Sequence, residues 1–217
     1  AIDAQMQHLK DRSREAFAMQ LREAPVQTDR TVERLDGGHE ISVSASSGHG
    51  RLMLDFTGTS AKHHGYFNAT PAIVHSAILY VLRLWSQTEV PLNEGILQLV
   101  DTELPECFLN PAFDEDPARC PAVVGGNVET SQRVGDALIR ALGIQACSQG
   151  TMNNFLFGND EFGYYETICG GTGAGDGYHG TAAIHSHMTN TAITDPEILE
   201  DRYPVRLHRF SIRSDSG

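Results

Sequence analysis

The sequence predicts an α+β fold in which mixed and antiparallel strands pack with helices. Two observations indicate this class: several long segments carry apolar residues at helical spacing, and short β-prone runs lie between them without regular strand–helix alternation. A chain of 217 residues with 40% apolar content can bury one substantial core. No internal repeat is visible.

Apolar residues in the N-terminal segment recur at helical spacing among many charged ones, at Ile2, Met6, Leu9, Phe17 and Leu21. This pattern predicts a surface helix over residues 2–23, which Pro25 stops. We therefore expect residues 1–24 to form a helix and residues 25–217 to form an α+β body.

Two short β-prone runs follow, His39–Ser44 and Arg51–Phe56, with the Ser- and Gly-rich stretch Ala45–Gly50 between them. Such a stretch suits a turn, so the two runs predict an antiparallel hairpin. A further strand is expected over Gly95–Leu104. The acidic, proline-bearing stretch Glu106–Pro117 predicts a surface loop.

Two buried helices are predicted in the middle of the chain. Residues 71–85 carry apolar side chains on one face, with Pro71 in the first turn. Residues 128–142 carry a second apolar stripe, which follows Gly125, Gly126 and Asn127 and stops at Gly143.

The C-terminal part predicts shorter elements. Phe155–Phe157 and Tyr164–Ile168 are candidate strands on either side of a turn at Asn159 and Asp160. Pro196–Tyr203 is a candidate short helix, and Val205–Ile212 is a candidate final strand.

Composition and charge exclude several classes of partner. The formal net charge of −12 opposes binding to nucleic acid or anionic lipid. The longest apolar run, Ala72–Leu82, is far shorter than the about 20 residues that span a bilayer. The four cysteines are too widely spaced for C-x-x-C zinc pairs, so we expect reduced thiols in a soluble, cytoplasmic protein.

The ends of the chain suggest a piece of a longer protein. It starts on Ala1 without a methionine, inside a predicted helix, and it stops at Gly217 directly after a strand-like run. We therefore expect more chain on both sides.

The stretch Ser148–Thr191 concentrates amides, a carboxylate, glycines and two histidines. Polar side chains of this kind are tolerated in an interior only when they are hydrogen-bonded or paired. Their density between short apolar runs predicts a lined cavity, and we interpret the stretch as the wall of a reaction site.

The glycine run Gly170–Gly180 formally contains the dinucleotide pattern G-x-G-x-x-G, but it does not directly follow a strand or open a helix. No G-x-x-x-x-G-K-[ST] phosphate loop occurs in the chain. Either the run lets backbone N–H groups approach a ligand, or it is a plain surface loop.

His185 and His187 lie two residues apart, so an extended backbone would direct both imidazoles to one face. Metal ligation, acid–base chemistry or hydrogen bonding to a substrate, and a structural role all remain open for this pair. Glu166 lies in the aromatic run YYETI, where burial would suit an acid or a base, but a solvated strand face is equally open. The remaining polar candidates are equally typical of helix caps and turns: Asn127, Glu129, Asn153 and Asn154.

Several longer phrases resemble the hydantoinase B / 5-oxoprolinase family, in the family's order and over most of residues 9–217. They are DFTGTS at Asp55–Ser60, GYFNA at Gly65–Ala69, GGNVETSQRVGDAL at Gly125–Leu138, SQGTMNN at Ser148–Asn154, YYETICGGTGAG at Tyr164–Gly175, and HSHMTNT followed by EILEDRYPVR. The resemblance implies an α+β architecture in cytoplasmic hetero-oligomers or fused chains. It also implies a hydantoinase A-type subunit or domain that handles ATP.

The resemblance implies ATP-dependent opening of a cyclic amide, such as a hydantoin or 5-oxoproline, or carboxylation of a ketone in the acetone carboxylase branch. The family's upstream phrase D-P-Y-x-G-G-T-H-x-x-D, to which we assign a divalent metal, does not occur here. Residues 1–217 therefore resemble the central portion of such a protein, which we expect to be inactive alone.

The residue candidates follow from the phrases that match. We expect catalytic roles for Glu166, His185 and His187, the two histidines being also weak metal candidates. We expect substrate-binding roles for Asn127, Glu129, Asn153, Asn154, Gly170 and Gly171. The alternative is a structural docking module whose polar phrases are caps and interface contacts.

Overall fold

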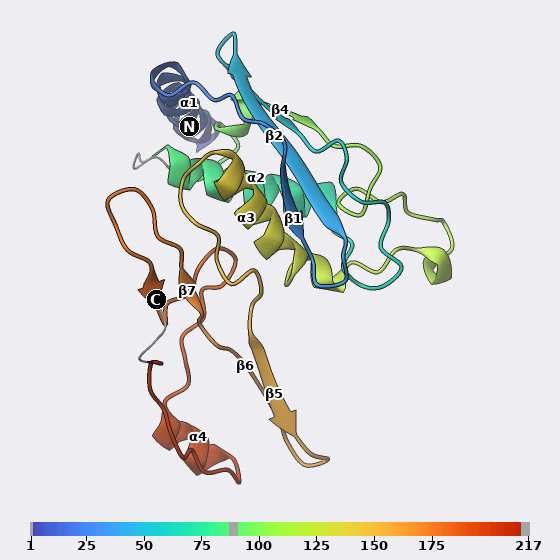
Figure 1. The fold of residues 1–217 in the computed structure, drawn as a ribbon, viewed down its shortest axis with the longest axis vertical. Coiled ribbons are helices and arrows are strands. Elements are labelled where there is room, and N and C mark those ends of the chain that lie inside the picture. Colours follow the sequence, from blue (N-terminus) through green and yellow to red (C-terminus); the bar gives the residue numbers. More distant parts are fainter. Residues whose placement is uncertain (1, 87–90, 214–217) are drawn as a thin grey trace.

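A computed structural model describes residues 2–86 and 91–213 as a two-layer body with an arm that extends from it (Figure 1). We define the body as residues 2–151 and the arm as residues 152–213. In the body, a four-stranded sheet packs against the helices α2 (Pro71–Trp85) and α3 (Thr130–Ala141). This arrangement confirms the predicted α+β class.

The sheet of the body is mixed, with the strands in the order β1-β2-β3-β4. The strands are β1 (Thr31–Arg34), β2 (Glu40–Gly48), β3 (Arg51–Asp55) and β4 (Val100–Glu103). The first three are antiparallel neighbours, and β4 joins β3 in parallel. The sequence predictions missed β1, because four residues are too few for a strand periodicity to be recognised.

One face of the sheet forms the core. Leu52 and Leu54 of β3 are fully buried, whereas Met53 between them is 42% exposed. This alternation is what a strand with one covered face requires. Ile41 and Val43 of β2 are fully buried in the same core, and Ser42 between them is buried as well.

The predicted hairpin is present, but its turn is shorter than predicted. β2 continues to Gly48, and only His49 and Gly50 connect it to β3. Both residues have positive φ, at 53° and 74°, as a two-residue type I′ turn requires. The Ser-rich end of β2 bonds to the segment that follows α1, because the Ser47 Oγ accepts a hydrogen bond from the Val26 N–H at 2.8 Å.

Two predictions in residues 95–117 need correction. Residues Leu97–Leu99 form a 3₁₀ turn, so the strand predicted over Gly95–Leu104 is confined to β4. The predicted surface loop is exposed near residues 112–119, but Cys107–Leu109 are buried. The Phe108 N–H donates to the Ser60 carbonyl and its own carbonyl accepts from the Ala69 N–H, so this stretch closes the core. Three apolar residues are too few to reveal such burial in the sequence.

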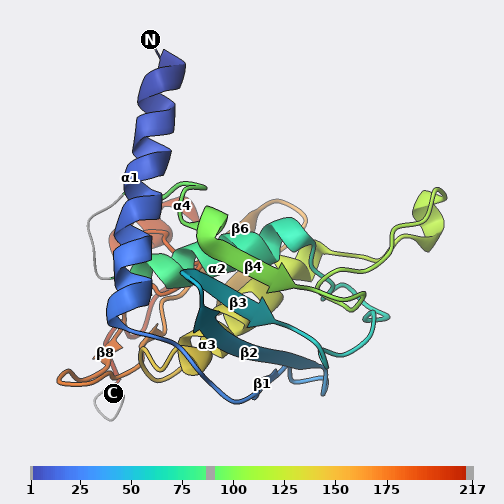
Figure 2. The ribbon, with the colours of Figure 1, turned by 90° about the horizontal axis from the view of Figure 1, so that it is seen from above.

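Helix α1 (Ile2–Glu23) contacts the body from Leu9 onward, and its first turns project away (Figure 2). Phe17 and Leu21 are buried, and the Phe17 ring meets Trp85 edge-on at a centroid distance of 5.9 Å. Gly95 allows a close approach to the helix, because a Cβ there would lie 2.0 Å from the Lys10 carbonyl oxygen. Among the described residues no helix combines the length and apolarity that a membrane crossing needs.

The arm consists of two small antiparallel pairs and one short helix. The strands β5 (Asn154–Gly158) and β6 (Gly163–Thr167) form its hairpin, and β7 (Gly171–Thr172) pairs with β8 (Thr181–Ala182). Helix α4 (Pro196–Arg202) confirms the predicted short helix. The strand predicted over Val205–Ile212 is wrong, because these residues are irregular and Phe210 and Ile212 are exposed without a neighbouring strand.

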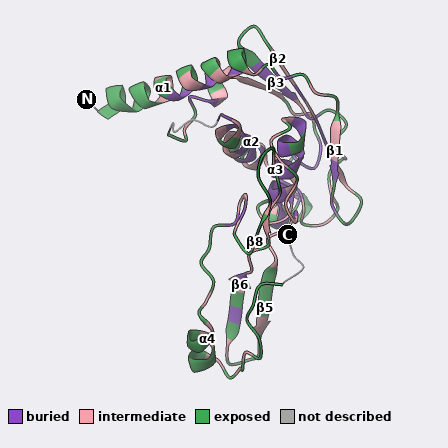
Figure 3. Ribbon diagram, turned by 60° about the vertical axis from the view of Figure 1, so that its left-hand side comes forward, coloured by how far each residue is buried: buried purple, intermediate pink, exposed green. Residues whose placement is uncertain are grey.

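The end of the arm is mainly exposed (Figure 3). Tyr203 packs its ring against Phe157, Phe162 and Tyr164 at centroid distances of 5.2 to 6.2 Å. The opposite face of the hairpin leaves Leu156 63% and Tyr165 58% exposed. This aromatic cluster is a small core compared with that of the body.

We expect backbone amides of β5 and β6 to exchange with deuterium at least tenfold faster than those of α2 and β3. Local opening is governed by buried apolar contact, of which the arm has little. Hydrogen–deuterium exchange with peptide mass analysis measures both regions in one experiment. Equal protection of the hairpin and the body would contradict this description of the arm.

Candidate functional site

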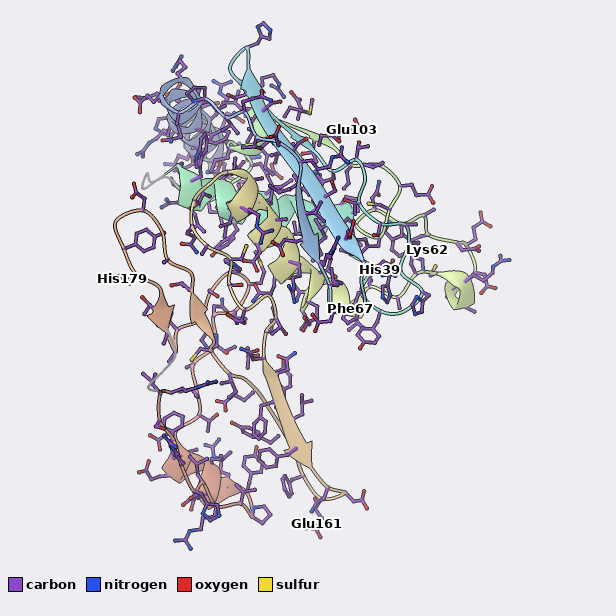
Figure 4. All side chains as sticks on the ribbon, viewed as in Figure 1. His39, Lys62, Phe67, Glu103, Glu161 and His179 are labelled. Atoms are coloured by element: carbon purple, nitrogen blue, oxygen red, sulfur yellow. The ribbon has the colours of Figure 1, made fainter. Side chains whose placement is uncertain are left out.

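A cleft of about 730 Å³ lies at the junction of body and arm. Four parts of the body line it together with the first strand of the arm. The parts of the body are the turn after β1 with Asp36, the loop with Tyr66 and Phe67, the entrance to α3, and the segment with Gln149 and Thr151; the arm contributes Asn154. Figure 4 labels Phe67, which lies near this junction. We call this hollow the junction cleft.

Two charged side chains of the cleft come from the start of α3, four residues apart and thus on one helix face. They are Glu129 and Arg133. The backbone just before them must approach the loop closely, because a Cβ on Gly126 would lie 2.5 Å from the Asn68 carbonyl oxygen. The GGN segment therefore brings the helix entrance against the loop that carries Tyr66 and Phe67.

Glu129 presents an oriented carboxylate to the cleft. Its Oε1 accepts a hydrogen bond from the Thr151 Oγ at 2.5 Å. Within the described residues, no hydrogen bond or ion pair engages Oε2. One oxygen thus fixes the side chain, and the other remains as an acceptor.

Arg133 supplies the positive charge of the cleft. Its Nη2 lies 3.3 Å from the Asp36 Oδ1, and the side chain is 22% exposed. The guanidinium also lies over Gly150, where a Cβ would come within 2.6 Å of it. Asp36 is fully exposed. An ion pair to such a group contributes at most about 1 kcal/mol, so a ligand anion or carbonyl can replace it.

Two amides complete the polar lining of the cleft. The Asn154 Oδ1 accepts from the Tyr165 hydroxyl at 2.8 Å and from the Thr167 Oγ at 3.1 Å, which leaves its NH₂ as a donor. The Gln149 NH₂ donates to the Thr151 carbonyl at 2.9 Å, while its Oε1 is buried without a protein partner among the described residues. A buried acceptor without a donor calls for water or a ligand N–H group.

The two predicted histidines do not share a face. His187 has a positive φ of 54°, which breaks the extended geometry that the two-residue spacing suggested. Its Nδ1 lies 3.1 Å from the Tyr80 hydroxyl and its Nε2 lies 2.8 Å from the Asp136 Oδ1. His185 lies elsewhere, with Nε2 3.4 Å from the Thr191 Oγ and Nδ1 buried without a partner among the described residues.

This placement does not fit metal binding by the pair, because both ring nitrogens of His187 already face protein groups. Across residues 2–86 and 91–213, no group of three or more His, Cys, Asp or Glu side chains is arranged to hold a metal ion. No donor set for the divalent metal implied by the resemblance is therefore formed in this part of the chain.

Glu166 lies in the arm, outside the junction cleft. Its Oε2 accepts from the Tyr164 hydroxyl at 2.7 Å and its Oε1 accepts from the Thr194 N–H. These bonds attach the segment before α4 to β6. The described geometry gives this carboxylate a structural role, and a catalytic role for it stays a prediction.

Of the other predicted site residues, Asn127 and Asn153 lie outside the junction cleft, and two glycines line a second hollow. Asn127 is exposed, and its carbonyl accepts from the Ser131 Oγ; Asn153 has a positive φ of 51°, and its carbonyl accepts from the Ile168 N–H. Neither lines the junction cleft. Gly170 and Gly171 line a smaller hollow of about 190 Å³ that shares Gln149 with the cleft. Of the predicted site residues, Glu129 and Asn154 are therefore the two in the junction cleft.

Sequence reasoning missed three groups of the cleft: Arg133, Gln149 and the aromatic pair Tyr66–Phe67. The position of Arg133 four residues after Glu129 was the available signal, because a helix aligns such residues. Near the cleft, His39 packs its ring at 4.3 Å from His63, and the stacked His63 and His64 rings lie 4.7 Å apart. Burial, and then these two neighbours, lower the pKa of His39.

Cys147 lies just before the cleft wall, in an acidic environment. Burial, followed by the proximity of Asp136 and Glu33, raises the pKa of its thiol to about 11. Arg140 opposes this shift but does not cancel it. The thiolate, which is the reactive form, is therefore scarce at neutral pH.

We expect iodoacetamide to alkylate Cys147 at pH 7.5 about 100-fold more slowly than in the denatured chain, because a pKa raised by about two units lowers the thiolate fraction by that factor. The native rate should continue to rise as the pH approaches 11. Peptide mass analysis of labelled native and denatured protein gives both rates. Equal rates in the two states would contradict the description of the thiol.

Two solved enzyme structures contain the fold of the described residues. An ATP-dependent caprolactamase from Pseudomonas jessenii has the same fold, with a TM-score of 0.70 at 21% identity over 97% of this chain and 39% of that one. An acetone carboxylase has a TM-score of 0.68 at 17% identity over 88% of this chain and 30% of that one. The described residues thus have the fold of a part of these larger enzymes.

The sequence profile of the Hydantoinase B/oxoprolinase family matches residues 1–217, and the chain belongs to this family. It is 48% identical to 5-oxoprolinase 1 of Arabidopsis thaliana over 178 residues, which are 82% of this chain and 14% of that protein. It is 44% identical to 5-oxoprolinase of Dictyostelium discoideum over 196 residues, which are 89% and 15%. The chain therefore spans about a seventh of the length of these relatives.

Proposed function

We propose that this chain is the central part of an ATP-dependent hydrolase that opens a cyclic amide, such as a hydantoin or 5-oxoproline. A hydantoinase A-type subunit or domain would handle ATP. The observation that supports the proposal most is the junction cleft, where an oriented carboxylate and a guanidinium lie on one face of α3. The family and the relatives named above support the same reaction class.

The chemistry of the cleft matches a cyclic amide. A small lactam ring holds its N–H and C=O groups side by side, so it presents one donor next to one acceptor. The Glu129 Oε2 can accept from the N–H, while Arg133 and the Asn154 NH₂ can donate to the carbonyl. Tyr66 and Phe67 offer apolar surface to the ring.

In this proposal the ATP-handling partner phosphorylates the amide oxygen, and water then attacks the activated carbon. Glu129 would take a proton from that water, and Arg133 would bind the negatively charged phosphate on the former amide oxygen. The ring nitrogen would take up a proton from Glu129 and leave as an amine when the C–N bond breaks. A second water would then hydrolyse the resulting acyl phosphate to a carboxylate and inorganic phosphate. We also propose that the complete protein binds a divalent metal and that it forms a cytoplasmic hetero-oligomer or a fused chain with the ATP-handling part.

A screen of the complete protein with its ATP-handling partner tests the proposal. Hydantoins, 5-oxoproline and small ketones are compared for ATP-dependent product formation, with and without bicarbonate. Ring-opened product that forms with ATP and without bicarbonate is the expected result. Residues 1–217 alone should give no turnover, whereas product formed without ATP would overturn the proposal.

Ketone carboxylation is the second candidate, and the fold likeness to acetone carboxylase is the observation that favours it. Bicarbonate-dependent consumption of a ketone in the same screen would support it. A structural docking role is the third candidate, favoured by the scaffold positions of His187 and Glu166. Full turnover by an assembly in which Glu129 and Arg133 of the junction cleft are substituted would support that role.

A further inference from the structure

Helix α3 carries a buried amide and a buried carboxylate that the proposed chemistry does not use. Gln132 is 0% exposed and Asp136 is 1% exposed, and they lie one helical turn apart on α3. An unpaired amide or carboxylate at such sites would be strongly destabilising. Each of them is instead paired with the same two segments of chain, Ser148–Thr151 and His187–Met188.

Asp136 binds one residue of each segment. Its Oδ1 accepts from the Ser148 N–H and lies 2.8 Å from the His187 Nε2, and its Oδ2 accepts from the Ser148 Oγ at 3.0 Å. The Ser148 Oγ in turn accepts from the Gly150 N–H at 3.1 Å. The carboxylate therefore fixes the start of the cleft wall and the imidazole together.

The bonds around His187 define one tautomer. The Tyr80 oxygen accepts from the His187 backbone N–H, and burial raises the pKa of this hydroxyl, so it keeps its proton for Nδ1. The ring then donates from Nε2 to Asp136, and both of its nitrogens have a partner. The imidazole acts as a bridge from Tyr80 on α2 to Asp136 on α3.

Gln132 repeats this arrangement one turn earlier. Its Oε1 accepts from the Met188 N–H at 3.0 Å, and its Nε2 donates to the Thr151 carbonyl at 3.3 Å. Thr151 is the residue whose Oγ orients Glu129. Gly135 lies between the two side chains on α3, where a Cβ would be 3.7 Å from the His187 ring.

We propose that Gln132 and Asp136 position the wall of the junction cleft. They bind the wall segment Ser148–Thr151 and the His187–Met188 turn at the same time, and we call this pair of residues the clamp. They are positioning residues, because they act on the site through Ser148 and Thr151. The proposal rests on the proposed function of the cleft. A shift of the wall would move Thr151 and Gln149 relative to Glu129, and displacements of about 1 Å reduce turnover about 100-fold.

Gln132→Met and Asp136→Asn test the clamp, with Asp160→Asn at the exposed tip of the arm's hairpin as the matched control. Hydrogen–deuterium exchange on the variants should rise at least tenfold in residues 148–151 and 187–188 together, with α2 unchanged. Nitrogen-15 NMR of the wild-type imidazoles should show a proton on the Nε2 of His187. In the complete enzyme, kcat should fall at least tenfold in Gln132→Met, with a smaller change in KM.

Exchange that rises in only one of the two segments, or in neither, would overturn the clamp. The clamp would also be overturned if the Gln132→Met enzyme kept the wild-type kcat although exchange rose in both segments. Positioning of the wall would then have no effect on turnover. If Asp136→Asn does not fold, Gln132→Met alone carries the test. The exchange and NMR results test the clamp independently of turnover. Failure of the clamp can therefore be distinguished from failure of the proposed function, which full turnover after substitution of Glu129 would indicate.

Discussion

Replacing Glu129 by glutamine in the complete ATP-dependent assembly is expected to lower kcat about 100-fold or more, the size of effect typical of removing a general base. The substitution preserves shape and keeps an oxygen that can accept from the Thr151 Oγ, so the fold should remain intact. It removes the charge and the basicity that the proposed water attack requires. Steady-state rates with saturating ATP measure the effect.

Glu166→Gln is the matched control, because it makes the same change in a carboxylate outside the junction cleft. Its bonds to Tyr164 and Thr194 join parts of the arm, so we expect a modest change in turnover, within about threefold. Circular dichroism spectra and melting curves of both variants establish that they fold. A large loss in Glu166→Gln, together with full activity in Glu129→Gln, would reverse the assignment of the two carboxylates.

Replacing Asn68 by alanine is expected to lower the free energy of unfolding by about 3 kcal/mol, since several buried groups lose their partners at once. Asn68 is 0% exposed, and its Oδ1 accepts from the His63 N–H at 2.7 Å. Its NH₂ donates to the carbonyls of His63, Gly65 and Ala122. The side chain thus ties the loop that carries Tyr66 and Phe67 to the chain before α3.

Urea denaturation monitored by circular dichroism measures this change, with the exposed Asn190→Ala as the control. The control should stay within about 0.5 kcal/mol of the parent protein. A loss below about 1 kcal/mol in Asn68→Ala would indicate that water replaces the amide and that the loop is fixed by other contacts. The same variant should also weaken substrate binding, because the loop forms one side of the cleft.

The helices were predictable because their apolar positions and end signals agree. Pro71 opens α2 at the predicted residue, and the apolar stripe of α3 is buried as its spacing indicates. Strands were predictable where β-prone residues stand together on either side of a turn, as in β3 and in the hairpin of β5 and β6. β1 and β4 are short and depend on their neighbours for pairing, and the run 205–212 is strand-like in composition but has no partner strand.

The polar residues of the site could be found in the sequence, but their grouping could not. The density of polar residues between Ser148 and Thr191 does contribute the cleft wall at Gln149, Thr151 and Asn154. The same residue types also serve as structural partners, as His187 does for Asp136. Which use applies depends on Asp36, Tyr66 and Arg133, which the fold brings from distant parts of the sequence.

A crystal structure of the complete enzyme with a cyclic amide and a non-hydrolysable ATP analogue tests the central claim most directly. We predict electron density for the ring in the junction cleft, with its N–H on the Glu129 carboxylate and its carbonyl within hydrogen-bonding distance of Arg133. Density for the ring at another place, with the junction cleft filled only by water, would contradict the assignment.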